Sequence, residues 1–498
     1  MKEENDTSYG HVLKYTGLFG GVQGLNILIG LVRNKIVASL LGPGGMGLAS
    51  LFNTTVNFIH QATNFGISFS AVRHVSELFD TGDEQRINHF IKVVRLWSLL
   101  TALLGMVVCI VAGPLLSNYT FSWGDHTLHF VLLSPAVAML AITGGETAIL
   151  KGARRLKPLA VIQVVSMLGA LLVSCPIYYF FYQTGIVPVI VLMALITMVS
   201  TIWYSYRLYP LRLRGENGFL GEGMEMVRLG IAFVVAGVMG SGAEMLIRSY
   251  LNVVGNLNMV GFYNTGFVMT MTYGGMVFSA METDYFPRLS AVNKDTALCN
   301  QTVNRQIEVS LLIIAPMLVA MLVATPILIP LLFTSEFLPV VNMMRITTLA
   351  LYLRAIKLPI CYLTLAKGDA LAFMVLEGIY DVVMVVLIIV GYQWLGLDGT
   401  GVALLLVALF DFLMIMVYTH FKYKYRMTKS VVSYSACQLS LGGLAFVATS
   451  NLLGWHYWLA GVLLFSLSLG YSLYVLHRKT SLWAKLVEKA RKQFHQSP

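Results

Sequence analysis

Fourteen long apolar runs constrain this chain most, because each can cross a bilayer as a single α-helix. About 20 residues are needed to span roughly 30 Å of hydrocarbon. The runs are residues 14–41, 46–72, 90–113, 128–150, 158–181, 187–206, 229–254, 260–283, 307–333, 340–366, 371–394, 400–420, 431–452 and 457–476. They do not alternate every second residue, which excludes a β-barrel. Only 12% of the 498 residues are charged and 57% are hydrophobic, so we predict an all-α polytopic membrane protein with about 14 transmembrane helices.

The positive charges predict the orientation of these helices. If both termini are cytoplasmic, every lysine and arginine outside the spans falls on an inner segment, and none falls on an outer loop. The excess of 34 Lys and Arg over 24 Asp and Glu therefore marks cytoplasmic loops and does not indicate nucleic-acid binding. In the basic tail, apolar residues recur at helical spacing, which favours an amphipathic helix on the inner leaflet over a plain basic tail. These residues are Trp483, Val487, Ala490 and Phe494.

An internal repeat organises the chain. The stretch from Arg33 to Gly47 resembles the stretch from Arg248 to Gly261, and six spans separate the two. An even number of spans keeps both copies in the same orientation, so we predict two parallel six-helix lobes around a central cleft. The predicted parts are an N-terminal lobe 1–206, a cytoplasmic linker 207–228, a C-terminal lobe 229–420, an extra helix pair 431–476 and a basic cytoplasmic tail 477–498.

Polar residues form three stripes inside the predicted membrane spans. Each stripe has spacings of three and four residues, which places its members on one helix face. The stripes are Gln23, Asn26, Gly30 and Arg33; Ser50, Asn53, Asn57, His60 and Asn64; and Gly237, Ser241, Glu244 and Arg248. Since polar groups in hydrocarbon are costly, we predict that the stripes line a hydrated cleft. The alternative is hydrogen bonding between helices in a dry interface.

The intramembrane charges suggest an anionic ligand. Arg33 has no acid on its own helix, and an unpaired guanidinium can hold a phosphate through two parallel hydrogen bonds. Arg248 can pair with Glu244, four residues earlier. Lys35 faces away from Arg33 and is expected to reach the outer headgroups. His60 is either a proton carrier or a hydrogen-bonded group.

Two further cations and several acids inside the spans can be interpreted either as functional groups or as structural partners of one another. Arg354 and Lys357 share a face, and they either serve the substrate or pair with Glu377 and Asp381. Glu146 is either a coupling site or a hydrogen bond between helices. The candidates for ion coupling are Glu146, Glu244, Glu377, Asp381 and Asp411.

The sequence lacks the motifs of common catalytic machinery. It has no GxxxxGK[ST] phosphate loop, no HExxH or GxSxG motif and no cysteine–histidine cluster with metal spacing. No extramembrane segment reaches about 40 residues, the minimum for a small folded domain. We therefore predict a protein that is not an enzyme and that needs no cofactor or metal.

Several stretches resemble a known family. Lys35-Ile-Val-Ala-Ser-Leu-Leu-Gly-Pro-Gly-Gly-Met-Gly47 resembles the end of helix 1 and the start of helix 2 in the polysaccharide flippases. Val260 to Asn264 resembles the start of helix 8, and Phe286 to Ser290 resembles the segment after it. These O-antigen and lipid-linked oligosaccharide translocases belong to the multidrug/oligosaccharidyl-lipid/polysaccharide exporter superfamily. The resemblance covers the first twelve spans, whereas a total of fourteen resembles the lipid II flippases.

The resemblance implies translocation of an undecaprenyl-diphosphate-linked oligosaccharide from the inner to the outer leaflet of the bacterial cytoplasmic membrane, by ion-coupled alternating access. Arg33, Arg248 and Arg354 would bind the diphosphate. The sugar would contact Gln23, Asn26, Asn53, Asn57, His60, Asn64 and Ser241. Membrane lipids, a glycan polymerase and a chain-length regulator are the implied partners.

Three other functions are compatible with many membrane spans. A multidrug or cation antiporter of the same superfamily would need unpaired acids, yet six intramembrane cations here face about five acids. A polysaccharide polymerase or ligase would carry a large outer loop, but the outer loop 114–127 is short. A small-solute carrier is typically built from inverted repeats, and the repeat here is parallel.

Overall fold

The fold is known from a computed structural model that describes residues 2–121, 123–210 and 219–479, with side chains from residue 24 onward apart from short gaps that include Asn26. The described residues form helices and no strand. The elements are α1 (Lys2–Thr63), α2 (Ile67–Thr81), α3 (Glu84–Thr120), α4 (Thr127–Gly152), α5 (Leu156–Phe181), η1 (Tyr182–Gly185), α6 (Ile186–Leu208), α7 (Phe219–Tyr250), η2 (Leu251–Gly255), α8 (Leu257–Phe267), η3 (Val268–Thr272), α9 (Tyr273–Ala291), α10 (Thr296–Leu332), η4 (Ser335–Phe337), α11 (Val340–Ala366), α12 (Ala370–Tyr423), α13 (Lys429–Asn451) and α14 (Gly454–Lys479).

These helices confirm the predicted all-α membrane fold. Nine helical segments of the described chain are long and apolar enough to cross a membrane. Two of them, Lys157–Leu208 and Ala370–Tyr423, each contain two predicted spans, and Leu28–Thr63 contains parts of the first two. The two remaining predicted spans, 229–254 and 260–283, lie in α7 and in α8 to α9. The chain is therefore an integral membrane protein, and its helices contain most of the residues of the fourteen apolar runs.

Exposed apolar side chains on the described surface agree with a lipid environment. Leu115 on α3 and Leu172 on α5 are 73% and 71% exposed. Buried apolar clusters lie inside, for example Val94 with Ile149 and, elsewhere, Ile307 with Ile360. Such a surface is stable in hydrocarbon but not in water.

Two long helices each contain a sharp turn at a glycine. Gly42 in α1 has φ 64° and ψ −175°, and Pro43 follows it. Gly396 in α12 has φ 59° and ψ −135°. Glycine tolerates positive φ, and proline cannot donate the next helical hydrogen bond. The turn at Gly42 therefore separates the first two predicted spans, and that at Gly396 separates the eleventh and twelfth.

The second predicted span, 46–72, is wrong as one continuous helix. It ends at Thr63, and α2 begins at Ile67 after a turn in which Phe65 and Gly66 have positive φ. A Cβ at Gly66 would lie only 2.9 Å from the carbonyl oxygen of Gly230 on α7. The break thus lets two backbones approach more closely than side chains allow, and apolar periodicity gives no sign of such a contact.

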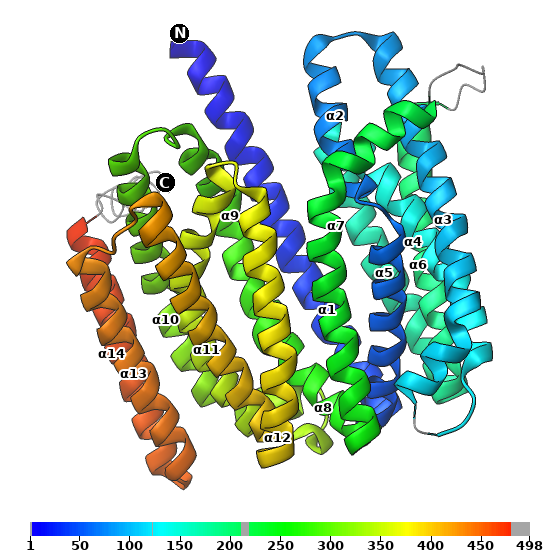
Figure 1. Cartoon of the computed structure of the whole chain (residues 1–498). Helices are drawn as coiled ribbons and strands as arrows, with labels where there is room; N and C mark the ends of the chain where they lie inside the picture. The colour runs from blue at the N-terminus through cyan, green and yellow to red at the C-terminus, as the bar shows by residue number, and fades with distance from the viewer. Residues whose placement is uncertain (1, 122, 211–218, 480–498) are drawn as a thin grey trace, which may run out of the picture. The chain divides into compact units, whose positions relative to one another are not determined.

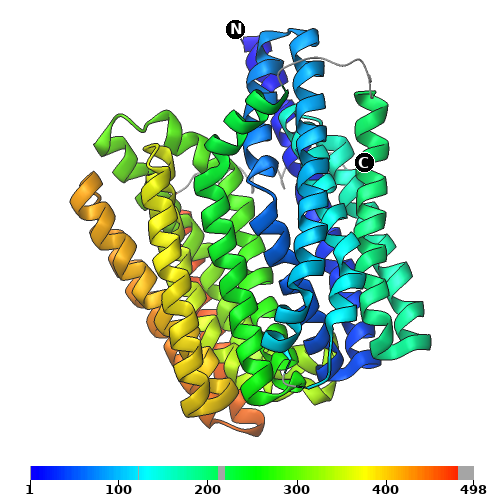
Figure 2. The same cartoon turned by 45° about the vertical axis from the view of Figure 1, so that its right-hand side comes forward.

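The chain divides into two compact units. The first contains residues 1–264, 330–337 and 377–385, and the second contains 265–329, 338–376 and 386–498. In the first unit α1 packs against α5 and α7, and α4 packs against α3 and α6 (Figure 1, Figure 2). In the second unit α13 packs against α11 and α14. The first unit includes α7, which the repeat assigns to the second lobe, so the division into two six-helix lobes stays a prediction. The predicted basic tail beyond residue 479 lies outside the described residues.

A reciprocal backbone contact joins the two copies of the repeat motif within the first unit. A Cβ at Gly47 would overlap the carbonyl oxygen of Leu257, and a Cβ at Gly261 would overlap that of Pro43. Gly47 corresponds to Gly261, and Pro43 to Leu257, at the same sequence offset. Residue pairs that contact each other reciprocally are typical of a two-fold relationship. The contact therefore supports the alignment of the two motifs.

Candidate functional site

A cavity of about 520 Å³ in the first unit contains both repeat-related arginines. Arg33, Asn53 and Asn57 line it from α1, and Glu244 and Arg248 line it from α7. Side chains from α5 and α6 complete the wall, including Tyr178, Met193 and Thr197. We call this space the Arg33–Arg248 cavity. It brings together two of the three predicted diphosphate ligands and two of the predicted sugar ligands.

Arg33 reaches the cavity wall with weak partners only. Its Nε donates to the Ser174 hydroxyl at 3.3 Å, and its Nη2 contacts the Met193 sulfur at 3.3 Å. No carboxylate among the side chains that the structure describes pairs with it. A half-buried guanidinium held by a hydroxyl and a thioether keeps most of its capacity for an anion.

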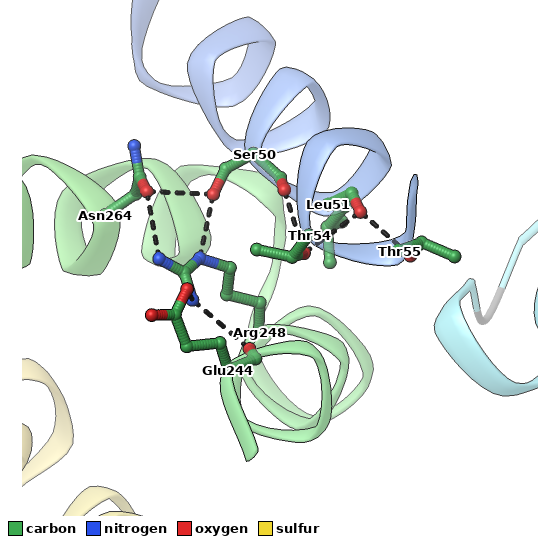
Figure 3. A network of polar contacts seen from close by, with 7 residues as sticks. All are labelled: Ser50, Leu51, Thr54, Thr55, Glu244, Arg248 and Asn264. Atoms are coloured by element: carbon green, nitrogen blue, oxygen red, sulfur yellow. Dashed lines mark hydrogen bonds and ion pairs between the residues drawn. The ribbon is translucent and has the colours of Figure 1, made fainter. Parts of the chain in front are cut away.

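Arg248 is instead fixed by a dense network (Figure 3). Its Nε donates to the Ser50 hydroxyl at 2.9 Å, and its Nη2 donates to Asn264 Oδ1 at 3.3 Å. Its Nη1 lies 3.2 Å from a Glu244 carboxylate oxygen and donates to the Glu244 carbonyl. The predicted Glu244–Arg248 pair is therefore present. Ser50 and Asn264 are repeat counterparts that also bond each other at 2.9 Å.

The electrostatics of the cavity favour an anion. Its lining contains two arginines and one carboxylate, Glu244, whose side chain is 42% exposed. Arg248 neutralises that carboxylate, so Arg33 supplies the net positive charge. Metal binding has no comparable support, since the described residues include no group of three or more His, Cys, Asp or Glu side chains placed to hold an ion.

The amide side chains of the second stripe differ in their surroundings. Asn53 donates to the Ala49 carbonyl at 2.8 Å and lines the cavity, as does the exposed Asn57. Further along, Asn64 donates to Ser68, and His60 Nδ1 is buried without a hydrogen-bond partner in the described structure. Only the first part of this stripe therefore lines the cavity.

The other stripe residues do not add to the described site. Ser241 donates to the Gly237 carbonyl of its own helix at 2.7 Å, and it is not among the lining residues. The side chains of Gln23 and Asn26 lie outside the described residues. Their predicted contact with sugar remains a prediction.

Arg354 and Lys357 lie in the second unit. Arg354 donates to the Met271 carbonyl at 3.4 Å and lies 6.0 Å from the Phe278 ring centroid. Lys357 forms a buried ion pair with Asp411 at 2.8 Å. The predicted pairing of Arg354 and Lys357 with Glu377 and Asp381 stays a prediction.

Glu146 forms a buried network rather than facing the cavity. Arg95 Nε lies 2.8 Å from Glu146 Oε1, and Ser205 donates to the second carboxylate oxygen. The Arg95 guanidinium lies 4.0 Å from the Tyr206 ring centroid. This arrangement matches the interpretation of Glu146 as a hydrogen-bonded group between helices.

Two other intramembrane cations serve the fold. Lys35 donates to the carbonyls of Pro330 and Phe333 at the end of α10, so it does not extend toward headgroups as expected. This contact satisfies carbonyls that a helix terminus leaves open. Arg345 donates to the Tyr457 hydroxyl at 3.2 Å.

The sequence analysis did not predict that α5 and α6 form part of the wall of the Arg33–Arg248 cavity. Ser174 and Tyr178 are four residues apart on α5, and Met193 and Thr197 are four apart on α6. Each pair shares a helix face, which is the only signal the sequence offers. Weakly polar residues in long apolar runs are too common for that spacing to identify a site.

Comparison with known proteins identifies relatives of this architecture. A family profile described as polysaccharide biosynthesis protein matches residues 36–342, which is more than half of the chain. No curated protein sequence matches the chain.

Three solved structures show the same fold. The chain is similar to an inward-facing multidrug resistance MATE family transporter of the MOP superfamily, with TM-score 0.68 and 14% identity over 80% of this chain and 94% of that one. It is similar to the lipid II flippase MurJ in an inward closed conformation, with TM-score 0.65 and 16% identity over 93% and 99%. A MOP superfamily transporter from Pyrococcus furiosus gives TM-score 0.60 and 14% identity over 82% and 94%.

Proposed function

This chain belongs to the polysaccharide biosynthesis protein family, and we propose that it is a flippase for a polyprenyl-diphosphate-linked oligosaccharide. In this proposal the substrate moves from the inner to the outer leaflet of the bacterial cytoplasmic membrane, and both termini are cytoplasmic. The related fold of the lipid II flippase is consistent with a lipid-linked substrate. No bond is made or broken in such a step.

The observation that carries the proposal is the state of Arg33. A cation inside a membrane normally pairs with an acid, yet Arg33 contacts only a hydroxyl and a thioether. It lines the same cavity as Arg248, whose own donors are already engaged. A diphosphate would complete the hydrogen bonding of Arg33 and would gain charge-assisted bonds worth about 1.5–3 kcal/mol each.

The remaining parts of the substrate have matching surroundings in this proposal. Asn53 and Asn57 offer amide groups to sugar hydroxyls, and the Tyr178 ring offers an apolar face. The polyprenyl chain stays in the bilayer. Arg354 would contact the diphosphate in another state of the transport cycle, and alternating access would come from rocking of the two lobes.

Ion coupling belongs to the same proposal. Glu244, Glu377, Asp381 and Asp411 are the carboxylates assigned to it. Glu146 is a further candidate, and like Glu244 and Asp411 it forms an ion pair with a basic side chain. A proton or cation that competes with these pairs would link ion movement to the transport cycle.

A lipid analysis of cells lacking the protein tests the proposal. Loss of the flippase should cause diphosphate-linked oligosaccharide to accumulate and surface glycan to disappear. Wild-type protein should restore both, and Arg33→Ala should lower export about tenfold or more. Arg33→Lys should restore export in part, since it keeps the charge but loses the bidentate geometry.

A surface arginine provides the matched control. Arg73→Ala removes an exposed cation that pairs with Glu77, and export should be unchanged. Near-normal export by Arg33→Ala, at wild-type levels in the membrane, would contradict the diphosphate role. Unchanged glycan in the deletion strain, with increased sensitivity to cationic dyes, would instead support a drug antiporter that uses Glu244.

A further inference from the structure

A second cavity adjoins the first within the same compact unit. It has a volume of about 590 Å³ and lies among α1, α4, α5 and α6. Its lining includes Lys151 in the last turn of α4, and Gln163 and Ser166 on α5. We call it the Lys151 cavity. Leu159, Ile162 and Met167 give it an apolar side.

The two cavities meet at Arg33. Arg33, Met193 and Thr197 line both of them, and the Arg33 guanidinium contacts Met193. The lining residues of α4 run from Ala136 in the first cavity to Lys151 in the second, about 22 Å along the helix. That length is most of the roughly 30 Å of membrane hydrocarbon. The cavities therefore form a column with Arg33 at its junction.

The charges of the Lys151 cavity are of one sign. Its lining contains two cations, Lys151 and Arg33, and no carboxylate. Glu146 lies one turn before Lys151 on α4, but it bonds Arg95 and Ser205 and is not among the lining residues. Like charges that share a cavity without an acid favour an anionic occupant.

One buried polar group in this wall has no hydrogen-bond partner among the described residues. This group is the Ser166 hydroxyl. Gln163 lies three residues away on the same face of α5 and lines the same space. An unsatisfied buried polar group costs about 1–3 kcal/mol, so a ligand or a water molecule that bonds to Ser166 would stabilise this wall.

We propose that the Lys151 cavity is a second anion-binding subsite for the phosphate groups of a lipid-linked substrate. This inference rests on the proposed function. In the proposed orientation, Lys151 lies at the cytoplasmic end of α4. It receives the phosphate first and passes it to Arg33, which then presents it to the Arg33–Arg248 cavity. Arg33 is the cation common to both steps, and the apolar side of the Lys151 cavity lies beside the point where the lipid joins the phosphate, while the rest of the polyprenyl chain stays in the bilayer.

Binding of a short polyprenyl diphosphate tests the subsite. Full-length protein in phosphatidylcholine nanodiscs is titrated with farnesyl diphosphate. Lys151→Gln should raise the Kd about tenfold, because one charge-assisted hydrogen bond is lost. Lys157→Gln removes an exposed lysine nearby that lines neither cavity, and its Kd should stay within about twofold of wild type.

Transport kinetics provide a second measurement, and it uses two different variants of the Lys151 cavity. Lys151→Gln should raise the apparent KM more than it lowers the maximal rate, since the subsite acts before the main cavity. Ser166→Leu fills the space without touching a charge, and it should reduce transport while the protein keeps its melting temperature. Wild-type binding and transport by both variants would overturn the subsite.

The same titration separates the possible sources of the phosphate. If Lys151→Gln weakens binding of phosphatidylglycerol but not of farnesyl diphosphate, the occupant is bulk phospholipid and the proposal fails. If Arg33→Ala abolishes farnesyl diphosphate binding while Lys151→Gln does not alter it, only the subsite fails and the flippase proposal stands. If wild-type protein does not bind farnesyl diphosphate, both fail.

Discussion

Two intramembrane cations, one in each compact unit, have different surroundings. In the second unit, Lys357 and Asp411 lie 2.8 Å apart with side chains 11% and 10% exposed, so each neutralises the other. In the first unit, Arg33 lines a cavity and has no described acidic partner. Both arrangements carry the cost of a charge in hydrocarbon, but Lys357 is neutralised by an acid, whereas Arg33 keeps donors for a ligand.

The comparison shows how structural and functional charges can be distinguished. A charge whose donors are all engaged by protein groups stabilises packing, and its removal should unfold the site. A charge with weak partners beside a cavity should affect binding and leave stability nearly unchanged. Arg248 lies between these extremes, because it lines the cavity yet bonds Ser50, Asn264 and Glu244.

The largest effect on stability should come from breaking the buried pair in the second unit. Lys357→Met removes the lysine that neutralises the buried Asp411 carboxylate and should cost about 3–5 kcal/mol. The double variant Lys357→Met with Asp411→Leu should recover most of the melting temperature in detergent, since the buried carboxylate is removed together with its lysine. Equal losses in the single and double variants would contradict this account of the pair.

Arg248→Ala should combine a moderate loss of stability with a loss of export. The substitution removes the bonds to Ser50 and Asn264 and should cost about 1–3 kcal/mol. Arg33→Ala should lower export at an almost unchanged melting temperature. The measurement is thermal unfolding of both purified variants alongside export in cells. Equal destabilisation by the two substitutions would remove the distinction between them.

Cysteine labelling should show a smaller but clear contrast on α1. The side chain of Asn57 is exposed and lines the cavity, whereas Thr55 is fully buried. Asn57→Cys should therefore react with small polar thiol reagents, and Thr55→Cys should not. Both variants are compared with the parent protein, whose five native cysteines set the background. Protection of Asn57→Cys in every condition would favour a dry interface.

The smallest effect should come from an ion pair outside the membrane spans. Lys422 and Tyr423 donate to Asp369 and hold the pKa of that carboxyl well below its usual value of about 3.9. Since the folded pKa is depressed, this stabilisation is present above about pH 4 and is lost as pH falls further. Asp369→Asn keeps an oxygen for the α12 cap but should lower the melting temperature slightly at pH 7 and weaken its acid dependence. Identical melting temperatures of the wild type and Asp369→Asn from pH 7 to pH 3 would contradict a stabilising role for this ion pair.

Sequence periodicity predicted most of the fold and about half of the described site. Long apolar runs report membrane spans directly, and stripe spacing identified Arg33, Asn53, Asn57 and Arg248 as residues with shared faces. Periodicity does not say which helix faces which, so the pairing of Arg95 with Glu146 could not be predicted. The break after Thr63 depends on a backbone contact between Gly66 and Gly230, which leaves no trace in hydropathy.

The reciprocal contact at Gly47 and Gly261 limits how the two halves of a duplicated chain can change in sequence. Two half-length ancestors that associated as a symmetric pair would meet at the same residue on both copies. After gene duplication and fusion, that meeting point becomes an internal contact between two codons that mutate independently. Neither glycine can then be replaced by a residue with a side chain unless the opposing carbonyl moves. The two fused halves therefore accumulate their sequence differences at other positions.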